Sequence, residues 1–122
     1  MKLRELFSLT ENPLTAIALR GSTIKKLPFP PSLIVNCTPV GMFPKSDFSP
    51  WPKGVPFPPE AAVYDLVYNP YQTLLIRQAL QAGLAATTGL GMLVEQAALS
   101  FERWIEVKAP RAAMHAEIAE LK

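Results

Sequence analysis

The sequence is poor in the residues that build disulfides, metal sites and acid–base catalysts. Its 122 residues include one cysteine, Cys37, one histidine, His115, and two aspartates, Asp47 and Asp65. A single cysteine forms no internal disulfide, and one cysteine with one histidine matches no standard zinc-ligand spacing. We therefore expect no structural metal and a reducing, cytoplasmic environment.

Charge of one sign and long apolar runs are also missing. Twelve Lys and Arg against ten Asp and Glu leave a net charge of +2, with the signs interleaved along the chain. A nucleic-acid or anionic-membrane partner requires a more concentrated basic surface. No stretch approaches 18 apolar residues, and the first 13 residues lack the hydrophobic region of a signal peptide. We expect neither a nucleic acid nor a membrane as partner.

Proline is the residue in excess. The chain has 13 prolines, ten of them between Pro28 and Pro59. Proline lacks a backbone donor and disfavours helix at the preceding residue, so regular structure is excluded between Pro39 and Pro59. We expect a long ordered loop here, and loops beyond about 12 to 15 residues are usually functional.

Strand and helix patterns alternate along the rest of the chain. Residues 33–37 are predicted to form a buried parallel strand, and residues 62–68 and 84–88 two further strands. An earlier strand candidate, residues 6–9, precedes a short helix predicted over residues 12–20 and ended by Gly21. Such alternation indicates an α/β fold with a parallel sheet.

Three more helices are predicted in the second half. Asn69-Pro70 opens the first, which Gly83 ends; a Gly89-Leu90-Gly91 turn precedes the second, and Pro110 starts the third. Helical spacing predicts an apolar stripe of Leu93, Ala97, Phe101 and Trp104 on the second helix, and it places Met114, Ile118 and Leu121 on one face of the third. No strand separates these two helices, so we expect them to fold over the sheet edge or onto a partner.

Short polar motifs follow the predicted strands. They are NCTPVGM (36–42), DLVYNP (65–70) and GLGMLVEQ (89–96), and SFERW (100–104) comes after them on the predicted helix. Ligands of open parallel sheets bind beyond the carboxyl ends of the strands. These positions are therefore candidates for a binding site.

In this order and spacing, the motifs resemble those of the C-terminal half of shikimate dehydrogenases. The family shows N-x-T-x-x-G-M, D-L/M-x-Y-x-P and G-x-x-M-L-x-x-Q in succession, and the resemblance covers about residues 33–107. It implies an NADP-dependent, reversible oxidation of shikimate to 3-dehydroshikimate in aromatic amino-acid biosynthesis. It also implies a partial Rossmann-type, three-layer NADP-binding domain over residues 1–88 and a C-terminal helical region over residues 89–122.

The resemblance assigns site residues by motif matching. Tyr68 and Gln96 would contact shikimate or a related hydroxy acid, because a polyhydroxylated acid needs hydroxyl and amide partners. The residues implied on the cofactor side are Asn36, Thr38, Leu66, Gly89 and Met92, the last three along the nicotinamide. Glycine at position 89 admits close approach by a flat ring.

Other parts of the family pattern have no counterpart in the sequence. The family's catalytic Lys and Asp and its Ser/Thr clamp belong to an N-terminal domain, and its Gly-rich phosphate turn opens the nucleotide domain. Glu11 stands where the family has a basic residue, which weighs against NADP. We therefore assign no catalytic residue and expect NADP affinity to be weakened or lost and the chain alone to be inactive.

Two other functions stay open at this stage. The chain could be a non-catalytic truncated paralogue, acting as a binding module or pairing with a separate N-terminal catalytic part. An exposed sheet edge would demand such pairing or promote self-association. A sister dehydrogenase of quinate or an aminoshikimate is the other alternative.

We expect purely structural or solvent-exposed roles for five further residues. We expect Asp65 to be a strand-end cap or a salt-bridge partner, and Cys37 to be a small core residue. We expect His115 to be solvated, and Trp104 to be a core residue together with Phe101.

Overall fold

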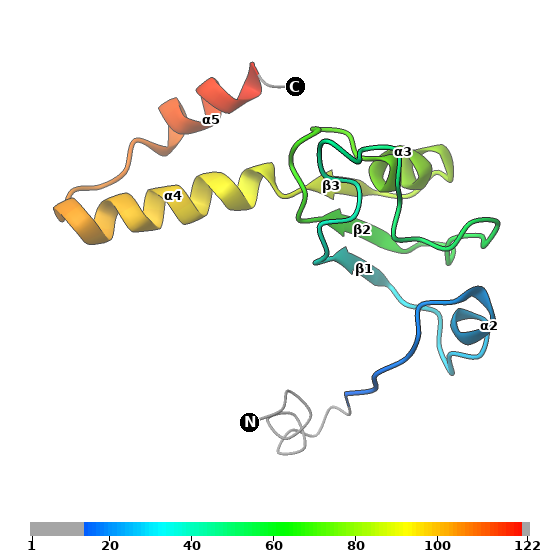
Figure 1. Cartoon of the computed structure of the whole chain (residues 1–122). Coiled ribbons are helices and arrows are strands. Elements are labelled where there is room, and N and C mark those ends of the chain that lie inside the picture. The colour runs from blue at the N-terminus through cyan, green and yellow to red at the C-terminus, as the bar shows by residue number, and fades with distance from the viewer. Residues whose placement is uncertain (1–13, 121–122) are drawn as a thin grey trace.

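The structure, a computed structural model, describes residues 14–120 (Figure 1). Strands β1 (Leu33–Asn36), β2 (Ala62–Asp65) and β3 (Ala86–Thr88) form a parallel sheet in the order β1-β2-β3. Asn36 lies opposite Asp65, and Asp65 lies opposite Thr88, so the carboxyl ends of all three strands meet at one edge. The predicted α/β fold with a parallel sheet is confirmed, although the strands are shorter than expected.

Four helices accompany this sheet in the described residues. They are α2 (Gly21–Ile24), α3 (Leu74–Gln81), α4 (Leu90–Ile105) and α5 (Arg111–Ala119). Figure 1 shows α3 beside the sheet, α4 leading away from the end of β3, and α5 running back along α4. The last two helices therefore form a hairpin that extends from the sheet instead of folding over it.

The core lies on the face of the sheet that α3 covers. Val63 of β2 and Leu75 and Ala79 of α3 are almost fully buried there. Trp51 of the proline-rich loop joins them, stacks on Phe57 with ring centroids 4.7 Å apart, and donates its indole N–H to a loop carbonyl. The loop that links β1 to β2 has no regular structure, as predicted, and its tryptophan anchors it to the core.

The other face of the sheet is less covered than predicted. β1 is parallel, but Leu33 and Val35 are 57% and 43% exposed, so the prediction of a buried strand is wrong for this face. Cys37, one residue beyond the end of β1, is exposed and not a core residue. The physical reason for both corrections is that no described helix packs against this side.

A buried carboxylate joins the ends of two strands to a helix. Asp65 is fully buried, and its Oδ2 accepts a hydrogen bond of 2.6 Å from the Thr73 hydroxyl. Its Oδ1 accepts from the Asn36 side-chain amide at 2.9 Å and from the Val67 N–H at 3.0 Å. The strand-end role of Asp65 is thus confirmed, whereas no Lys or Arg among residues 14–120 forms an ion pair with it.

The starts of the helices differ from prediction. α3 begins at Leu74 and not at Asn69-Pro70, because Thr73 caps it by accepting from the Ile76 N–H. Its predicted end at Gly83 is confirmed within two residues. Gly89 is the N-cap of α4, so Gly91 lies inside the helix and not in a turn.

The helix predicted over residues 12–20 is also wrong for residues 14–20, the part that the structure describes. Residues 14–20 are irregular and exposed, and α2 begins at Gly21, where the predicted helix ended. Short helices need tertiary packing, and nothing covers the apolar side chains of this segment. The strand candidate at residues 6–9 lies outside the described residues.

α4 buries a different stripe from the one predicted. Leu90, Val94 and Ala98 are its buried residues, whereas Trp104 is 81% exposed. The stripe of Leu93, Ala97, Phe101 and Trp104 is therefore not the buried one; Phe101 is partly buried, and the prediction of Trp104 as a core residue is wrong. α5, which starts after Pro110 as predicted, packs along the neighbouring face of α4 and leaves this stripe at least partly open.

Arg111 holds the hairpin of α4 and α5 together. Its guanidinium contacts Glu102 at 2.5 Å and Glu95 at 3.0 Å, and the Ala109 N–H also donates to Glu102. These hydrogen bonds, chiefly that from Arg111, lower the pKa of Glu102 from 4.5 to about 2. His115 is half-exposed, as expected, with its Nε2 3.8 Å from Glu95.

The Asp65 hydrogen bonds predict a specific loss of stability. Thr73→Val keeps the shape of the side chain but removes its bonds to Asp65 and to Ile76. We expect the free energy of unfolding to fall by about 2 to 3 kcal/mol, since a bond to a buried charge and a helix cap are lost together. Urea unfolding followed by circular dichroism measures this. Thr87→Val, on the exposed strand position, is the matched control and should change stability by less than about 0.5 kcal/mol.

The lowered pKa of Glu102 predicts a loss of stability in acid. The unfolded chain takes up the proton near pH 4.5, whereas the folded hairpin resists it down to about pH 2. The contribution of Glu102 is therefore complete above the unfolded pKa and disappears as pH falls through this window. Urea midpoints at several acidic pH values should fall more steeply for the wild type than for Glu102→Gln. Equal slopes would contradict the prediction, and Glu106→Gln, which removes no described ion pair, is the control.

Candidate functional site

The side chain of Asn36 organises the end of β1. Its amide donates to Asp65 and, at 3.2 Å, to the Val40 carbonyl. Its Oδ1 accepts from the Thr38 N–H at 3.0 Å and from the Thr38 hydroxyl at 2.7 Å. A side-chain amide offers two donor hydrogens and two acceptor lone pairs. All four are used within the chain, so Asn36 shapes the loop and fixes Thr38.

Thr38 and Tyr68 present hydroxyls beyond the strand ends. Thr38 is exposed and follows β1, and its hydroxyl also accepts from the Val40 N–H at 3.3 Å. Tyr68 follows β2 and is 44% exposed. Both residues are therefore exposed at the edge where candidate residues were expected, although the Thr38 hydroxyl already donates its hydrogen to Asn36.

Gly89 and Leu66 bring the ends of β2 and β3 into contact. Gly89 is buried, and a Cβ placed on it would overlap the carbonyl oxygen of Leu66 and lie 3.0 Å from the Leu66 Cα. The Leu66 N–H donates to the Asn36 carbonyl at 3.1 Å. Close approach of two backbones thus requires glycine here. The Leu66 backbone therefore explains by itself why residue 89 is glycine, and no cofactor ring is needed for that explanation.

Met92 and Gln96 continue from Gly89 along one side of α4. They follow Gly89 by three and seven residues, a spacing that places all three on the same helical face. Met92 is 39% exposed, and Gln96 is also exposed. Gln96 lies about 10 Å along the helix from Gly89, at 1.5 Å per residue. It lines a separate hollow with Leu93, Ala97, Ser100, Phe101, Trp104 and Met114.

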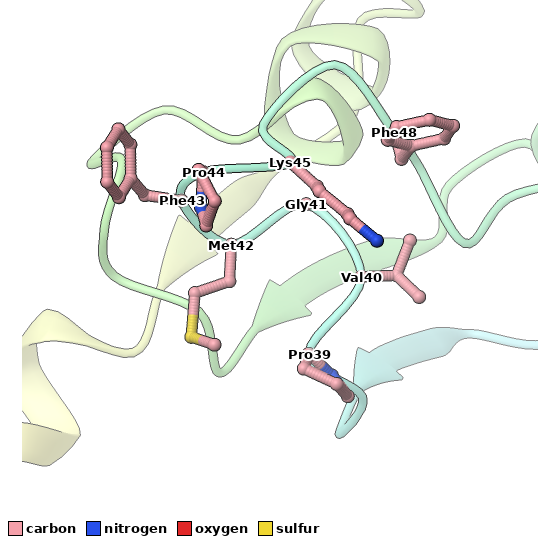
Figure 2. Close-up of a pocket in the computed structure, with 8 residues that line it drawn as sticks. All are labelled: Pro39, Val40, Gly41, Met42, Phe43, Pro44, Lys45 and Phe48. Atoms are coloured by element: carbon pink, nitrogen blue, oxygen red, sulfur yellow. The ribbon is translucent and has the colours of Figure 1, made fainter.

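The loop after Thr38 encloses an apolar hollow. Its volume is about 490 Å³, and its lining residues, drawn in Figure 2, are Pro39, Val40, Gly41, Met42, Phe43, Pro44, Lys45 and Phe48. Gly41 has a φ of +94°, and a Cβ there would lie 3.1 Å from the Phe48 carbonyl oxygen. The loop therefore requires glycine in the middle of the NCTPVGM motif.

Motif matching found the strand-end residues but missed two features beside them. The first is the hydroxyl of Thr73, which donates to Asp65, the strand-end residue already expected, and with it supports Asn36. Lys45 extends its side chain across the hollow with its amino group toward Val40 (Figure 2). In the sequence, Lys45 is the first charged residue after the motif, in a proline-rich stretch that also contains Asp47 and Lys53.

The arrangement suits binding more than proton transfer. Asn36, Thr38, Leu66 and Gly89 are brought together at the sheet edge, Tyr68 follows Leu66 in the same loop, and Met92 and Gln96 lie along α4. Within residues 14–120, no group of three or more His, Cys, Asp or Glu side chains could hold a metal ion. No helix in that range is long and apolar enough to cross a membrane.

Comparisons with known proteins point to one family. Residues 89–118 match the family described as the shikimate 5'-dehydrogenase C-terminal domain. NADP-dependent shikimate dehydrogenases from Salinibacter ruber and Methanopyrus kandleri are 45% and 40% identical over 84 and 105 residues, which cover 68% and 86% of this chain. The matched segments make up 30% and 36% of those two relatives, so the chain spans about a third of their length.

A solved structure gives the same result for the fold. Shikimate 5-dehydrogenase from Thermus thermophilus, in complex with NADP(H) and shikimate, superposes with a TM-score of 0.65 at 37% identity. The superposition covers 75% of this chain and 34% of that one. The chain therefore belongs to the shikimate dehydrogenase family and matches the C-terminal part of its members.

Proposed function

We propose that this chain provides the nicotinamide side and part of the shikimate side of an NADP-dependent shikimate dehydrogenase site. The observation that carries the proposal is the meeting of three motifs at one sheet edge, where Asn36, Leu66 and Gly89 are in contact through hydrogen bonds and backbone packing. A crevice beyond the carboxyl ends of parallel strands is where open α/β sheets bind dinucleotides.

The residues present fit one end of the cofactor. Met92 is 39% exposed near the start of α4 and offers an apolar surface for a nicotinamide ring, while the contact between Gly89 and Leu66 holds the start of that helix at the strand ends. Thr38, held by Asn36, offers a hydroxyl on the same edge. When bound, NADP supplies the hydride acceptor for the oxidation of a substrate alcohol. Residues 14–120 contain no Gly-rich turn for the pyrophosphate, which supports weakened affinity for NADP in this chain.

Tyr68 and Gln96 are the proposed contacts to shikimate. The Tyr68 hydroxyl lies at the strand end and is accessible to a substrate hydroxyl or carboxylate. Gln96, on the face of α4 that begins with Gly89, would meet the substrate from the helix side. A pocket with such polar groups rejects analogues that leave them unpaired.

The proton of the substrate hydroxyl needs a base from elsewhere in the family fold. Asp65 is fully buried and already bonded to Asn36, Thr73 and Val67, so we do not assign it to proton transfer. The division into a nucleotide-binding part over residues 1–88 and a helical part over residues 89–122 belongs to this proposal, as does a cytoplasmic location.

A non-catalytic role is the second candidate function. It is supported by the exposed apolar side chains of β1, which a partner protein could cover, since Leu33 is 57% and Val35 43% exposed. In that case the chain would bind a ligand or a partner protein without turning over shikimate.

The chain by itself should show no turnover. We expect no detectable shikimate-dependent NADP reduction by the purified 122-residue chain, because neither the general base nor the phosphate turn is present. Absorbance at the NADPH maximum with saturating shikimate measures this. Turnover at ordinary enzyme concentrations would overturn the prediction and place the missing groups within this sequence.

A chimera tests the proposed substrate contact. In it, the 84-residue segment of the Salinibacter ruber relative is replaced by the matching residues of this chain. We expect NADP-dependent shikimate oxidation, and Tyr68→Phe should raise KM for shikimate on the order of fivefold through the loss of one hydrogen bond. Tyr64→Phe, which lies within β2 and not in the motif that follows it, is the matched control. Equal KM values for the two variants would remove Tyr68 from the site.

A further inference from the structure

Arg111 connects the first turn of α5 to two separate turns of α4. Its Nη1 and Nη2 atoms donate to the two carboxylate oxygens of Glu102, and its Nε donates to Glu95 at 3.0 Å. Glu95 and Glu102 are seven residues apart, about 10 Å along the same side of the helix. A planar guanidinium that donates to two carboxylates at once fixes both its own direction and its place. Arg111 therefore sets where α5 begins on α4.

Apolar packing contributes little to the position of α5. None of its nine residues is buried, and Met114 and Ile118 are only partly covered. A helix of this length needs tertiary contacts to be stable. The only other charged contact between the two helices in residues 14–120 joins His115 to Glu95 at 3.8 Å, with both side chains half-exposed. The position of α5 along α4 thus depends mainly on Arg111.

Met114 is the residue that α5 contributes to a hollow on α4. It lies three residues after Arg111, and this spacing places both on one face of α5. Met114 lines a hollow of about 370 Å³ whose other lining residues, Gln96 among them, all belong to α4. Figure 1 shows α5 running back along α4, the arrangement that brings Met114 to this hollow. The distance between Met114 and Gln96 therefore follows from the contacts of Arg111.

We propose that Arg111 is a positioning residue for the substrate side of the site: it seats α5 so that Met114 restricts the side chain of Gln96. The inference rests on the proposed function, because the restriction affects the reaction only if Gln96 contacts shikimate. Gln96 is exposed, and a long exposed side chain loses rotamer freedom when it binds. A wall that limits this freedom beforehand lowers the cost of binding. Arg111 would act through Met114 without touching the substrate.

Nuclear magnetic resonance of the full 122-residue chain tests the positioning. We expect nuclear Overhauser effects between the Met114 methyl group and the side chains of Gln96 and Phe101 across the hollow. Arg111→Gln should abolish them and leave the amide shifts of residues 62–88 unchanged, because the core lies elsewhere. Arg103→Gln is the matched control, since Arg103 is exposed on α4 and forms no described ion pair. It should leave the Met114 contacts in place.

The kinetics of a chimera test the consequence for the substrate. The chimera is the Salinibacter ruber relative with residues 89–118 of this chain in place of their counterparts. Arg111→Gln should raise KM for shikimate roughly threefold through the added rotamer freedom of Gln96, with kcat and KM for NADP unchanged. In a Gln96→Ala background the same substitution should change KM no further, because residues that act as a unit are not additive.

The two arms separate the failure of the inference from the failure of the proposed function. Met114 contacts that survive Arg111→Gln overturn the inference, as do equal effects of Arg111→Gln on KM with and without Gln96. If Gln96→Ala raises KM and Arg111→Gln does not, the inference fails and the proposed substrate contact stands. If Gln96→Ala leaves KM unchanged, that contact fails, and the role of Arg111 toward the substrate fails with it. If the chimera does not fold, the Met114 contacts alone decide.

Discussion

The buried carboxylate of Asp65 is the constraint on which the rest of the site depends. It receives the Asn36 amide, the Thr73 hydroxyl and the Val67 N–H, and so joins β1, β2 and the start of α3. A buried anion is tolerated only when hydrogen bonds replace its hydration. Because Asn36 in turn holds Thr38 and the Val40 carbonyl, the position of the loop after β1 follows from this one carboxylate. The polar side chains at the strand ends thus shape the site before any ligand arrives.

Local sequence patterns predicted where helices and strands lie better than they predicted which side chains are buried. Breakers on both sides placed β1 near its observed bounds, and Thr73, not the Asn-Pro pair, proved to start α3 because capping needs a side chain at the right distance. Trp104 and Cys37 were expected in the core and are exposed. Hydrophobic spacing marks a face that can be buried, but it does not state what covers that face. The errors therefore cluster where covering elements are missing from the described residues.

For the candidate site, the sequence predicted which residues lie at the sheet edge but not the contacts that hold them there. Asn36, Thr38, Leu66 and Gly89 came from motif spacing, and the structure brings them to one edge of the sheet. The hydrogen bonds that saturate Asn36 could not be read from spacing, since they involve Asp65, 29 residues away. The motif also did not reveal that glycine is required at position 89 because the backbone of Leu66 packs against it. Long-range contacts of this kind decide whether a conserved-looking pattern binds a ligand directly or supports a neighbour that does.

The contact between Gly89 and Leu66 sets the direction in which α4 leaves the sheet. α4 has 16 residues and leads away from the sheet, so it acts as a lever about 24 Å long, at 1.5 Å per residue. A tilt of about 10° at Gly89 would carry the far end, with Trp104, through roughly 4 Å. The α5 helix would move with it, because Arg111 ties the two helices together. A side chain at position 89 would thus displace the far end of α4, near Trp104, more than the sheet edge beside it.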